Sequence, residues 1–192
     1  MFTTVFVLSV VLGLLLGGSF RTLARSDIKG IEWFLAGFLA ETALDFAASR
    51  APAAVGPWIV PVDIVTYVTV LVGVWLNRRL LGMAFVGAGS ILNAIVIFAN
   101  GGRMPVDPQA LARAGIVDLA EYLATGHSGT HGLMTAGTRL RWLGDVWAMP
   151  AWSFRPAAFS IGDVLIALGI CLVVLRLMGA PRAWWRKSTS PA

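Results

Sequence analysis

The chain has 192 residues, of which 57% are hydrophobic and only 13% are charged. Soluble domains carry about 25% charged residues, so this composition argues against a globule that faces water on all sides. The formal net charge of +5 does not indicate nucleic-acid binding, because nine of the fifteen basic residues lie in three clusters beside hydrophobic segments: Arg21, Arg25 and Lys29; Arg78 and Arg79; and Arg176, Arg182, Arg186 and Lys187.

Five hydrophobic segments approach the length of about 20 residues that a helix needs to cross a bilayer. The first, residues 2–18, has no basic residue before it, which favours a retained helix over a cleaved signal peptide. The others cover about 31–48, 58–76, 80–98 and 159–178. We therefore expect an all-α integral membrane bundle of five transmembrane helices, forming one domain over residues 1–192, with an extracytoplasmic cap of short surface helices over 99–158.

The three basic clusters predict the orientation of this bundle. Cytoplasmic loops of membrane proteins are enriched in Lys and Arg, and all three clusters fall on one side if the chain crosses five times. We therefore expect a multi-pass protein of the bacterial cytoplasmic (inner) membrane, with the N-terminus outside and the C-terminus in the cytoplasm. Trp184 and Trp185 should then lie at the inner headgroup level.

The second segment carries two carboxylates, Glu41 and Asp45, whose spacing of four residues places them on one face of a helix. Asp45 has a simple alternative, because it can reach the outer interface beside Ser49 and Arg50. Glu41 is harder to explain in that way, since about 18 Å of helix separates it from Lys29 at the inner end.

The third and fourth segments each add one polar side chain near the outer end. Asp63 follows Pro57 and Pro61, and it either joins a polar cluster or interacts with the positive end of the helix dipole. Asn93 lies about one and a half turns from the end of its helix, where an amide commonly bonds to a neighbouring helix. We expect Asn93 to make such an interhelical contact.

The connection over 99–158 is too long for a plain loop. Its opening Asn100-Gly101-Gly102 predicts a tight turn with positive φ. Two short amphipathic helices are expected next, at Pro108–Ala114 and Ile116–Ala124, lying on the membrane surface.

His127 and His131 have the i, i+4 spacing of a metal-binding pair. However, the stretch from Gly126 to Gly132 contains three glycines, which argue against a helix there, and no third ligand is obvious. We therefore expect no metal site and no cofactor.

Two aspartates lie close to the start of the last segment. Asp145 belongs to a tryptophan-rich stretch that we expect at the outer surface, and Asp163 follows Ser160 at the spacing of a capping box. An ionisable group inside a bilayer costs about 2.5–3.5 kcal/mol, so several polar side chains at one depth indicate a built site. The expected cluster comprises Glu41, Asp45, Asp63, Asn93, Asn100, Asp145 and Asp163.

Several classes of chemistry have no motif in this sequence. It contains no G-x-x-x-x-G-K-[ST], H-E-x-x-H, C-x-x-C or G-x-S-x-G, so nucleotide, zinc and serine-hydrolase sites have no local support. Cys171 is the single cysteine, which excludes an intrachain disulfide.

A set of motifs spread over nearly the whole chain resembles a known family. They are Gly13–Gly18 before the basic loop Arg21–Lys29, Asn100–Val106, Thr138 with Leu143-Gly144-Asp145, and Ser160–Asp163. Together they resemble a bacterial family of uncharacterised polytopic membrane proteins, catalogued as a domain of unknown function. The resemblance implies a multi-pass membrane protein and brings no activity with it.

The last third also resembles lipoprotein signal peptidase (signal peptidase II). The final helix of that family begins with Phe-Asn-x-Ala-Asp, whose Asp is one of two catalytic carboxylates. Phe159-Ser160-Ile161-Gly162-Asp163 is similar to this motif, and Asp145 lies upstream at a comparable distance. The resemblance implies that Asp145 and Asp163 form a catalytic pair, although Ser160 and Gly162 replace the Asn and the Ala.

The sequence leaves more than one function open. We favour a non-catalytic membrane component, namely a scaffold, an accessory subunit or a small-molecule binder, in which the polar cluster holds helices and cap together. The alternative is an intramembrane aspartyl hydrolase in which Asp145 and Asp163 share one proton, with transport or proton conduction as a third class. Expected partners are the lipid bilayer and either a membrane protein complex or a lipid-linked substrate, and no nucleic acid.

Overall fold

The computed structural model describes residues 2–150, 152–153 and 156–180. The described chain is mostly helical, and a helix forms in each of the five hydrophobic segments. These helices are α1 (Phe2–Leu15), α3 (Ile31–Ala48), α5 (Ile59–Leu76), α6 (Leu81–Ala99) and α9 (Ile161–Leu177). Shorter elements join them: α2 (Phe20–Ala24) precedes α3, and α4 (Pro52–Val55) with the 3-10 turn η1 (Gly56–Trp58) precedes α5.

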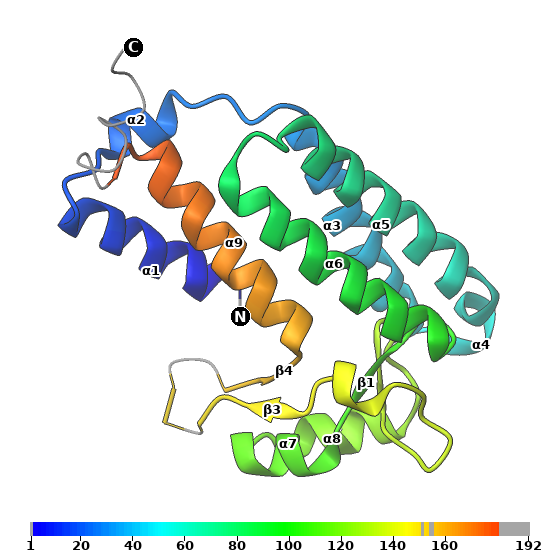
Figure 1. Ribbon diagram of the computed structural model, residues 1–192. Coiled ribbons are helices and arrows are strands. Elements are labelled where there is room, and N and C mark those ends of the chain that lie inside the picture. Colours follow the sequence, from blue (N-terminus) through cyan, green and yellow to red (C-terminus); the bar gives the residue numbers. More distant parts are fainter. Residues whose placement is uncertain (1, 151, 154–155, 181–192) are drawn as a thin grey trace.

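The five long helices form a curved row in the order α1, α9, α6, α5 and α3 (Figure 1). The pair α6 and α9 is central and makes the most extensive contact, whereas α1 packs mainly on α9 and α3 mainly on α5. Helices α1 and α3 are therefore the two ends of the row. The segment between α6 and α9 lies at one end of the bundle, opposite α2 and the turn between α5 and α6 (Figure 1).

Glycines bring α6 and α9 into backbone contact. A Cβ at Gly82 would meet the carbonyl oxygen of Gly169, and a Cβ at Gly89 would meet the carbonyl oxygen of Gly162. The residue number rises by seven along α6 between these two contacts and falls by seven along α9, so the two helices run antiparallel. A glycine from each helix lies at both contacts. Such spacing allows dispersion contacts that larger side chains would prevent.

The cap between α6 and α9 contains helices and two small sheets. The helices α7 (Pro108–Ala114) and α8 (Val117–Ala124) form as expected. Strands β1 (Met104–Val106) and β2 (His131–Leu133) pair in parallel, and β3 (Trp147–Ala148) and β4 (Ala158–Phe159) pair antiparallel, with the 3-10 turn η2 (Arg141–Leu143) between β2 and β3. The strands were not expected, and Val106, Leu111 and Leu123 form the buried core beneath them.

Among the described residues, two helical stretches are long and apolar enough to span a membrane, Pro52–Leu76 and Leu81–Ala99. The expected number of five is not reached on these criteria. Helix α1 has 14 residues and α9 has 17, and α3 carries Glu32, Glu41 and Asp45. The expected positions of Trp184 and Trp185 lie outside the described residues.

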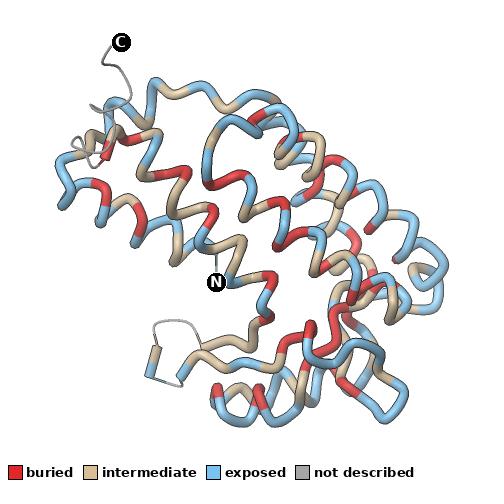
Figure 2. The backbone as a smooth tube through the Cα atoms, viewed as in Figure 1, coloured by how far each residue is buried: buried red, intermediate tan, exposed pale blue. Residues whose placement is uncertain are grey.

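Only a minority of the residues in the most apolar part of each stretch are buried. The buried share is 28% for the first and 44% for the second, which differs from the core helix of a soluble protein. Exposed positions recur along every long helix (Figure 2). They include large apolar side chains on each of the five, such as Leu8, Phe46, Val65, Ile91 and Leu168.

Candidate functional site

A cavity of about 590 Å³ lies within the helix row, lined by all five long helices and by the cap. Ligand sites commonly have about 300–1,000 Å³. On α9 its lining extends from Asp163 in the first turn to Leu177 at the last residue, which is about 21 Å of helix rise. A cavity of this volume that extends over this length is narrow.

The two ends of the cavity differ in chemistry. At the end away from the cap the lining is apolar, with Leu23, Ile28, Ile31, Met83 and Leu177. At the cap end, hydroxyl, amide, imidazole and carboxyl groups come together. These polar residues are Glu41, Thr66, Tyr67, Ser90, Asn93, Thr130, His131, Asp145 and Asp163. Of the seven residues in the expected cluster, four therefore line this cavity: Glu41, Asn93, Asp145 and Asp163.

Asp145 is held in the cap by its backbone. Its N–H donates to the carbonyl of Pro105 and its carbonyl accepts from the N–H of Asp107, so it is bridged to Val106 at the end of β1. The residue is 5% exposed, and its Oδ1 atom has no hydrogen-bond partner among the described residues. Burial, and then the nearby charge of Asp163, raise the pKa of Asp145 to about 8.

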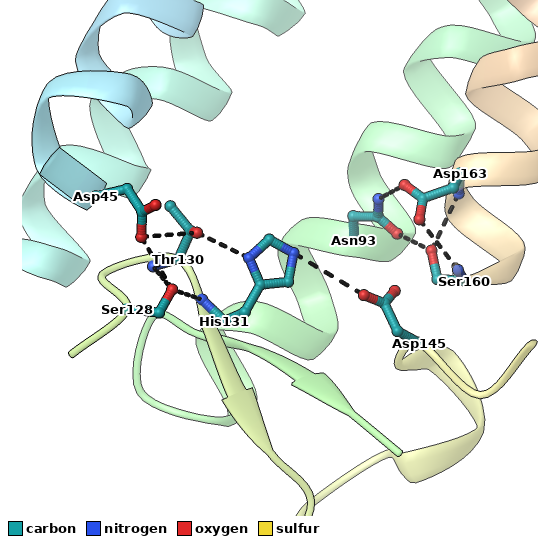
Figure 3. A network of polar contacts seen from close by, with 8 residues as sticks. All are labelled: Asp45, Asn93, Ser128, Thr130, His131, Asp145, Ser160 and Asp163. Atoms are coloured by element: carbon teal, nitrogen blue, oxygen red, sulfur yellow. Dashed lines mark hydrogen bonds and ion pairs between the residues drawn. The ribbon is translucent and has the colours of Figure 1, made fainter. Parts of the chain in front are cut away.

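His131 faces Asp145 from β2, the strand that pairs with β1. Its Nε2 atom lies 3.9 Å from Oδ2 of Asp145, and its Nδ1 atom lies 2.7 Å from the hydroxyl oxygen of Thr130 (Figure 3). Desolvation inside the fold lowers the pKa of His131, although the carboxylates of Asp163 and Asp45 act in the opposite direction. The ring is therefore neutral near pH 7 and has one nitrogen free to accept.

Asp45 connects the cap to α3. Its Oδ1 atom accepts from the Ser128 hydroxyl and the Gly129 N–H at 2.9 Å each, and from the Thr130 hydroxyl at 3.4 Å (Figure 3). Asp45 therefore neither lines the cavity nor simply faces the outer interface. Through Thr130 it is linked to the ring of His131.

Asp163 belongs to a capping box at the start of α9. The Ser160 hydroxyl accepts from the Asp163 N–H, and Oδ2 of Asp163 accepts from the Ser160 N–H, both at 3.0 Å. The other oxygen, Oδ1, accepts from the side-chain amide of Asn93 on α6, whose own oxygen accepts from the Ser160 hydroxyl (Figure 3). The interhelical contact expected of Asn93 is therefore present.

The remaining two residues of the expected cluster, Asp63 and Asn100, lie outside the cavity lining. Asp63 is 3% exposed and its Oδ2 atom has no hydrogen-bond partner among the described residues, with Gly102 packed against it. It lies beyond the first turn of α5, so the helix-dipole alternative does not describe it. Asn100 exchanges hydrogen bonds with the backbone of Arg139 and so holds a cap loop at the end of α6.

Sequence reasoning missed His131 and Thr130 as site residues, because it considered His131 only as a metal ligand. The strand β2 that carries His131 is short and lies in a glycine-rich stretch, so no periodicity marks it. Among the described residues no group of three potential ligands could hold a metal ion. The polar groups at the cap end are linked by hydrogen bonds among themselves.

Comparison with known proteins identifies the family but no activity. Residues 25–175 match a family of unknown function (DUF5317), and the chain belongs to that family, as the motifs of the sequence indicated. No curated protein and no solved structure matches the chain. The resemblance of the last third to lipoprotein signal peptidase therefore receives no support from these comparisons.

Proposed function

We propose that this protein is a multi-pass membrane protein that holds an amphiphilic molecule, with its apolar chain between the helices and its polar group at the cap. It is a binding component rather than an enzyme. The proposal has two parts, the membrane location and the ligand class, and different features support each of them.

The distribution of apolar and aromatic side chains supports the membrane location. Large apolar residues are exposed on every long helix, as the lipid-facing side of a bundle requires. Tryptophan favours the membrane–water interface, and Trp58 and Trp75, both 64% exposed, mark the two ends of the α5 region. Their separation of 17 residues corresponds to about 26 Å of helix, close to the hydrocarbon thickness of about 30 Å.

The basic clusters support one orientation. Arg21, Arg25, Arg78 and Arg79 fall in α2, the segment after it and the turn between α5 and α6, at the end of the bundle opposite the cap (Figure 1). Under the positive-inside rule that end is cytoplasmic, so the cap and the N-terminus lie outside. Reporter fusions after Arg79 should be active in the cytoplasm and fusions after Gly126 outside; the reverse pattern would overturn this orientation.

The ligand class is supported by one observation above all, the change in chemistry along a single cavity. The lining is apolar at the end away from the cap, and its polar residues lie between the middle of α6, at Ser90, and the cap, so it matches a molecule with an apolar chain and one polar end. The cavity lies between the two ends of the helix row, where α1 and α3 make no extensive contact. A chain could therefore enter from the lipid without unfolding the bundle.

The alternative function, an aspartyl hydrolase, has weaker support. Two carboxylates that share a proton and activate water need free oxygens. Asp145 has one, but both oxygens of Asp163 already accept hydrogen bonds, from Asn93 and from the Ser160 N–H. Asp163 would have to leave its helix cap to act as a catalytic group, so binding explains this geometry better.

Native mass spectrometry of the purified protein tests the binding function. We expect the wild-type protein to retain an amphiphile through mild detergent, and Ile170→Trp, which fills the cavity from α9, to lose it. The matched control is Leu168→Trp on the same helix, because Leu168 is 44% exposed and lies outside the cavity lining. Equal retention by wild type and Ile170→Trp would contradict the proposal.

A further inference from the structure

The polar end of the cavity has an uneven charge. Three carboxyl residues line it, Glu41 from α3, Asp145 from the cap and Asp163 from α9. No lysine or arginine is among the described lining residues. The remaining titratable groups there are His131, which is neutral near pH 7, and Tyr67 from α5.

Two buried polar atoms at this end have no partner within the described chain. They are Oδ1 of Asp145, in a residue 5% exposed, and the hydroxyl of Thr66, in a residue 4% exposed. Both residues line the cavity. Because an unsatisfied buried polar atom costs about 1–3 kcal/mol, such atoms indicate a ligand or water that bonds to them.

The contacts of Thr130 bear on which nitrogen of the His131 ring accepts a hydrogen bond. The Thr130 hydroxyl oxygen lies 2.7 Å from Nδ1 of His131 and 3.4 Å from Oδ1 of Asp45. If this hydroxyl donates to Asp45, its oxygen accepts from the Nδ1–H of His131. The Nε2 atom is then unprotonated and accepts a hydrogen bond on the side that faces Asp145 (Figure 3).

Resting on the proposed function, we propose that the polar group of the bound amphiphile is a protonated primary amine. An ammonium group has three N–H donors, and the site offers it the free Oδ1 of Asp145 and, in the tautomer described above, Nε2 of His131, which lies 3.9 Å from the other oxygen of the same carboxyl group. Its positive charge is complementary to Glu41, Asp145 and Asp163. A phosphate or carboxylate would lie among these carboxyl groups without a cationic partner, which is unfavourable in a poorly solvated site.

Proton release should accompany binding. With no amine bound, burial and Asp163 hold the pKa of Asp145 at about 8, so Asp145 is largely protonated at pH 7. An ammonium beside it favours the charged carboxylate and displaces that proton. The affinity should therefore rise between pH 6 and about 8, where Asp145 titrates, with Glu41, Tyr67, His131 and Asp163 as the other titratable groups facing the site.

Calorimetric titration in mild detergent with three ligands of equal chain length tests the inference: dodecylamine, dodecanol and dodecyl phosphate. We expect dodecylamine to bind about tenfold or more tightly than dodecanol, and dodecyl phosphate to bind most weakly. Asp145→Asn should lower the affinity for dodecylamine by about ten- to hundredfold and leave that for dodecanol within about threefold. Glu121→Gln, an exposed carboxylate of the same cap, is the matched control.

The outcomes separate this inference from the function on which it rests. Equal or tighter binding of dodecyl phosphate, or an unchanged dodecylamine affinity in Asp145→Asn, would overturn the amine assignment while a bound chain still supports the cavity. Binding of none of the three ligands, or binding that Ile170→Trp leaves intact, would overturn the proposed function itself. If Asp145→Asn does not fold, the ranking of the three ligands by affinity for the wild-type protein still tests the amine assignment.

Discussion

The Nε2 atom of His131 lies 3.9 Å from Oδ2 of Asp145, facing it across the polar end of the cavity. Strand β1 brings the two residues together. Strand β2, which contains His131, pairs with β1, and Asp145 bridges to Val106 at the end of β1. A separation of 3.9 Å is too long for a hydrogen bond. The two groups therefore do not satisfy each other's hydrogen bonding, which leaves both able to bond to a ligand.

Stability should fall as the pH rises, because of Asp145. Its pKa is about 8 in the folded protein and about 3.9 in an unfolded chain. Between these values the folded state keeps a proton that the unfolded state has released, so stability decreases from about pH 4 to about pH 8 and then levels off. We expect Tm to drop by at least about 4 °C over this range from this group.

Thermal melts of the ligand-free protein in detergent check this pH dependence. Asp145→Asn should reduce the slope of the curve between pH 5 and 8, whereas Glu121→Gln should keep the wild-type slope. An identical slope in the wild type and in Asp145→Asn would show that Asp145 does not carry the proton.

Removal of the Asp45 carboxylate should release the cap loop from α3. The carboxylate accepts three hydrogen bonds from residues 128–130. In Asp45→Ala all three donors lose this acceptor. Hydrogen exchange should accelerate at Gly129 by about tenfold or more, since a lost charged hydrogen bond is worth about 1.5–3 kcal/mol. Glu32→Ala, at the opposite end of α3, should leave this exchange unchanged, and slow exchange at Gly129 in Asp45→Ala would contradict the assignment.

Asp163→Asn should destabilise the protein through the start of α9. Both oxygens of Asp163 accept hydrogen bonds, so an amide group must point its NH₂ at one of two donors and lose that bond. The expected loss in unfolding free energy is about 0.5–2 kcal/mol, measured by denaturant titration in detergent. Asp118→Asn, in the first turn of α8 and exposed, should cost much less; equal costs would argue against the capping box.

Gly89→Ala should weaken the contact between α6 and α9. The added Cβ would meet the carbonyl oxygen of Gly162 and the side chain of Ile166, and such overpacking costs about 1–3 kcal/mol. Gly56→Ala is the control, because a Cβ at Gly56 has open space around it. The same denaturant titration measures both, and a neutral Gly89→Ala would show that the two helices can separate slightly without loss.

Local patterns predicted much of the fold. Long apolar runs gave the five helices, and Gly101 and Gly102 have the positive φ that their turn requires, 72° and 87°. Ser160 and Asp163 form the capping box that their spacing indicated. Each of these features depends on residues close together in the sequence, so it can be predicted without knowledge of the tertiary structure.

The site was less accessible to sequence reasoning, because its groups are brought together over long distances in the chain. The similar depth of seven polar residues in the expected membrane suggested one cluster. In the structure, Asp45 and Asn100 bind cap loops and Asp63 lies outside the cavity lining. His131 reaches Asp145 only through the parallel pairing of β1 and β2. The sequence of such short strands contains no alternation long enough to predict that pairing.

Photolabelling tests the central claim most directly, because it identifies the residues that touch the ligand. A dodecylamine probe with a diazirine in its chain should label the cavity side of α9, at Ile166 and Ile170. Excess unlabelled dodecylamine should suppress that labelling. Labelling confined to Val164 and Leu168, which are 43% and 44% exposed and lie outside the cavity lining, would show a probe dissolved around the protein and contradict a bound amphiphile.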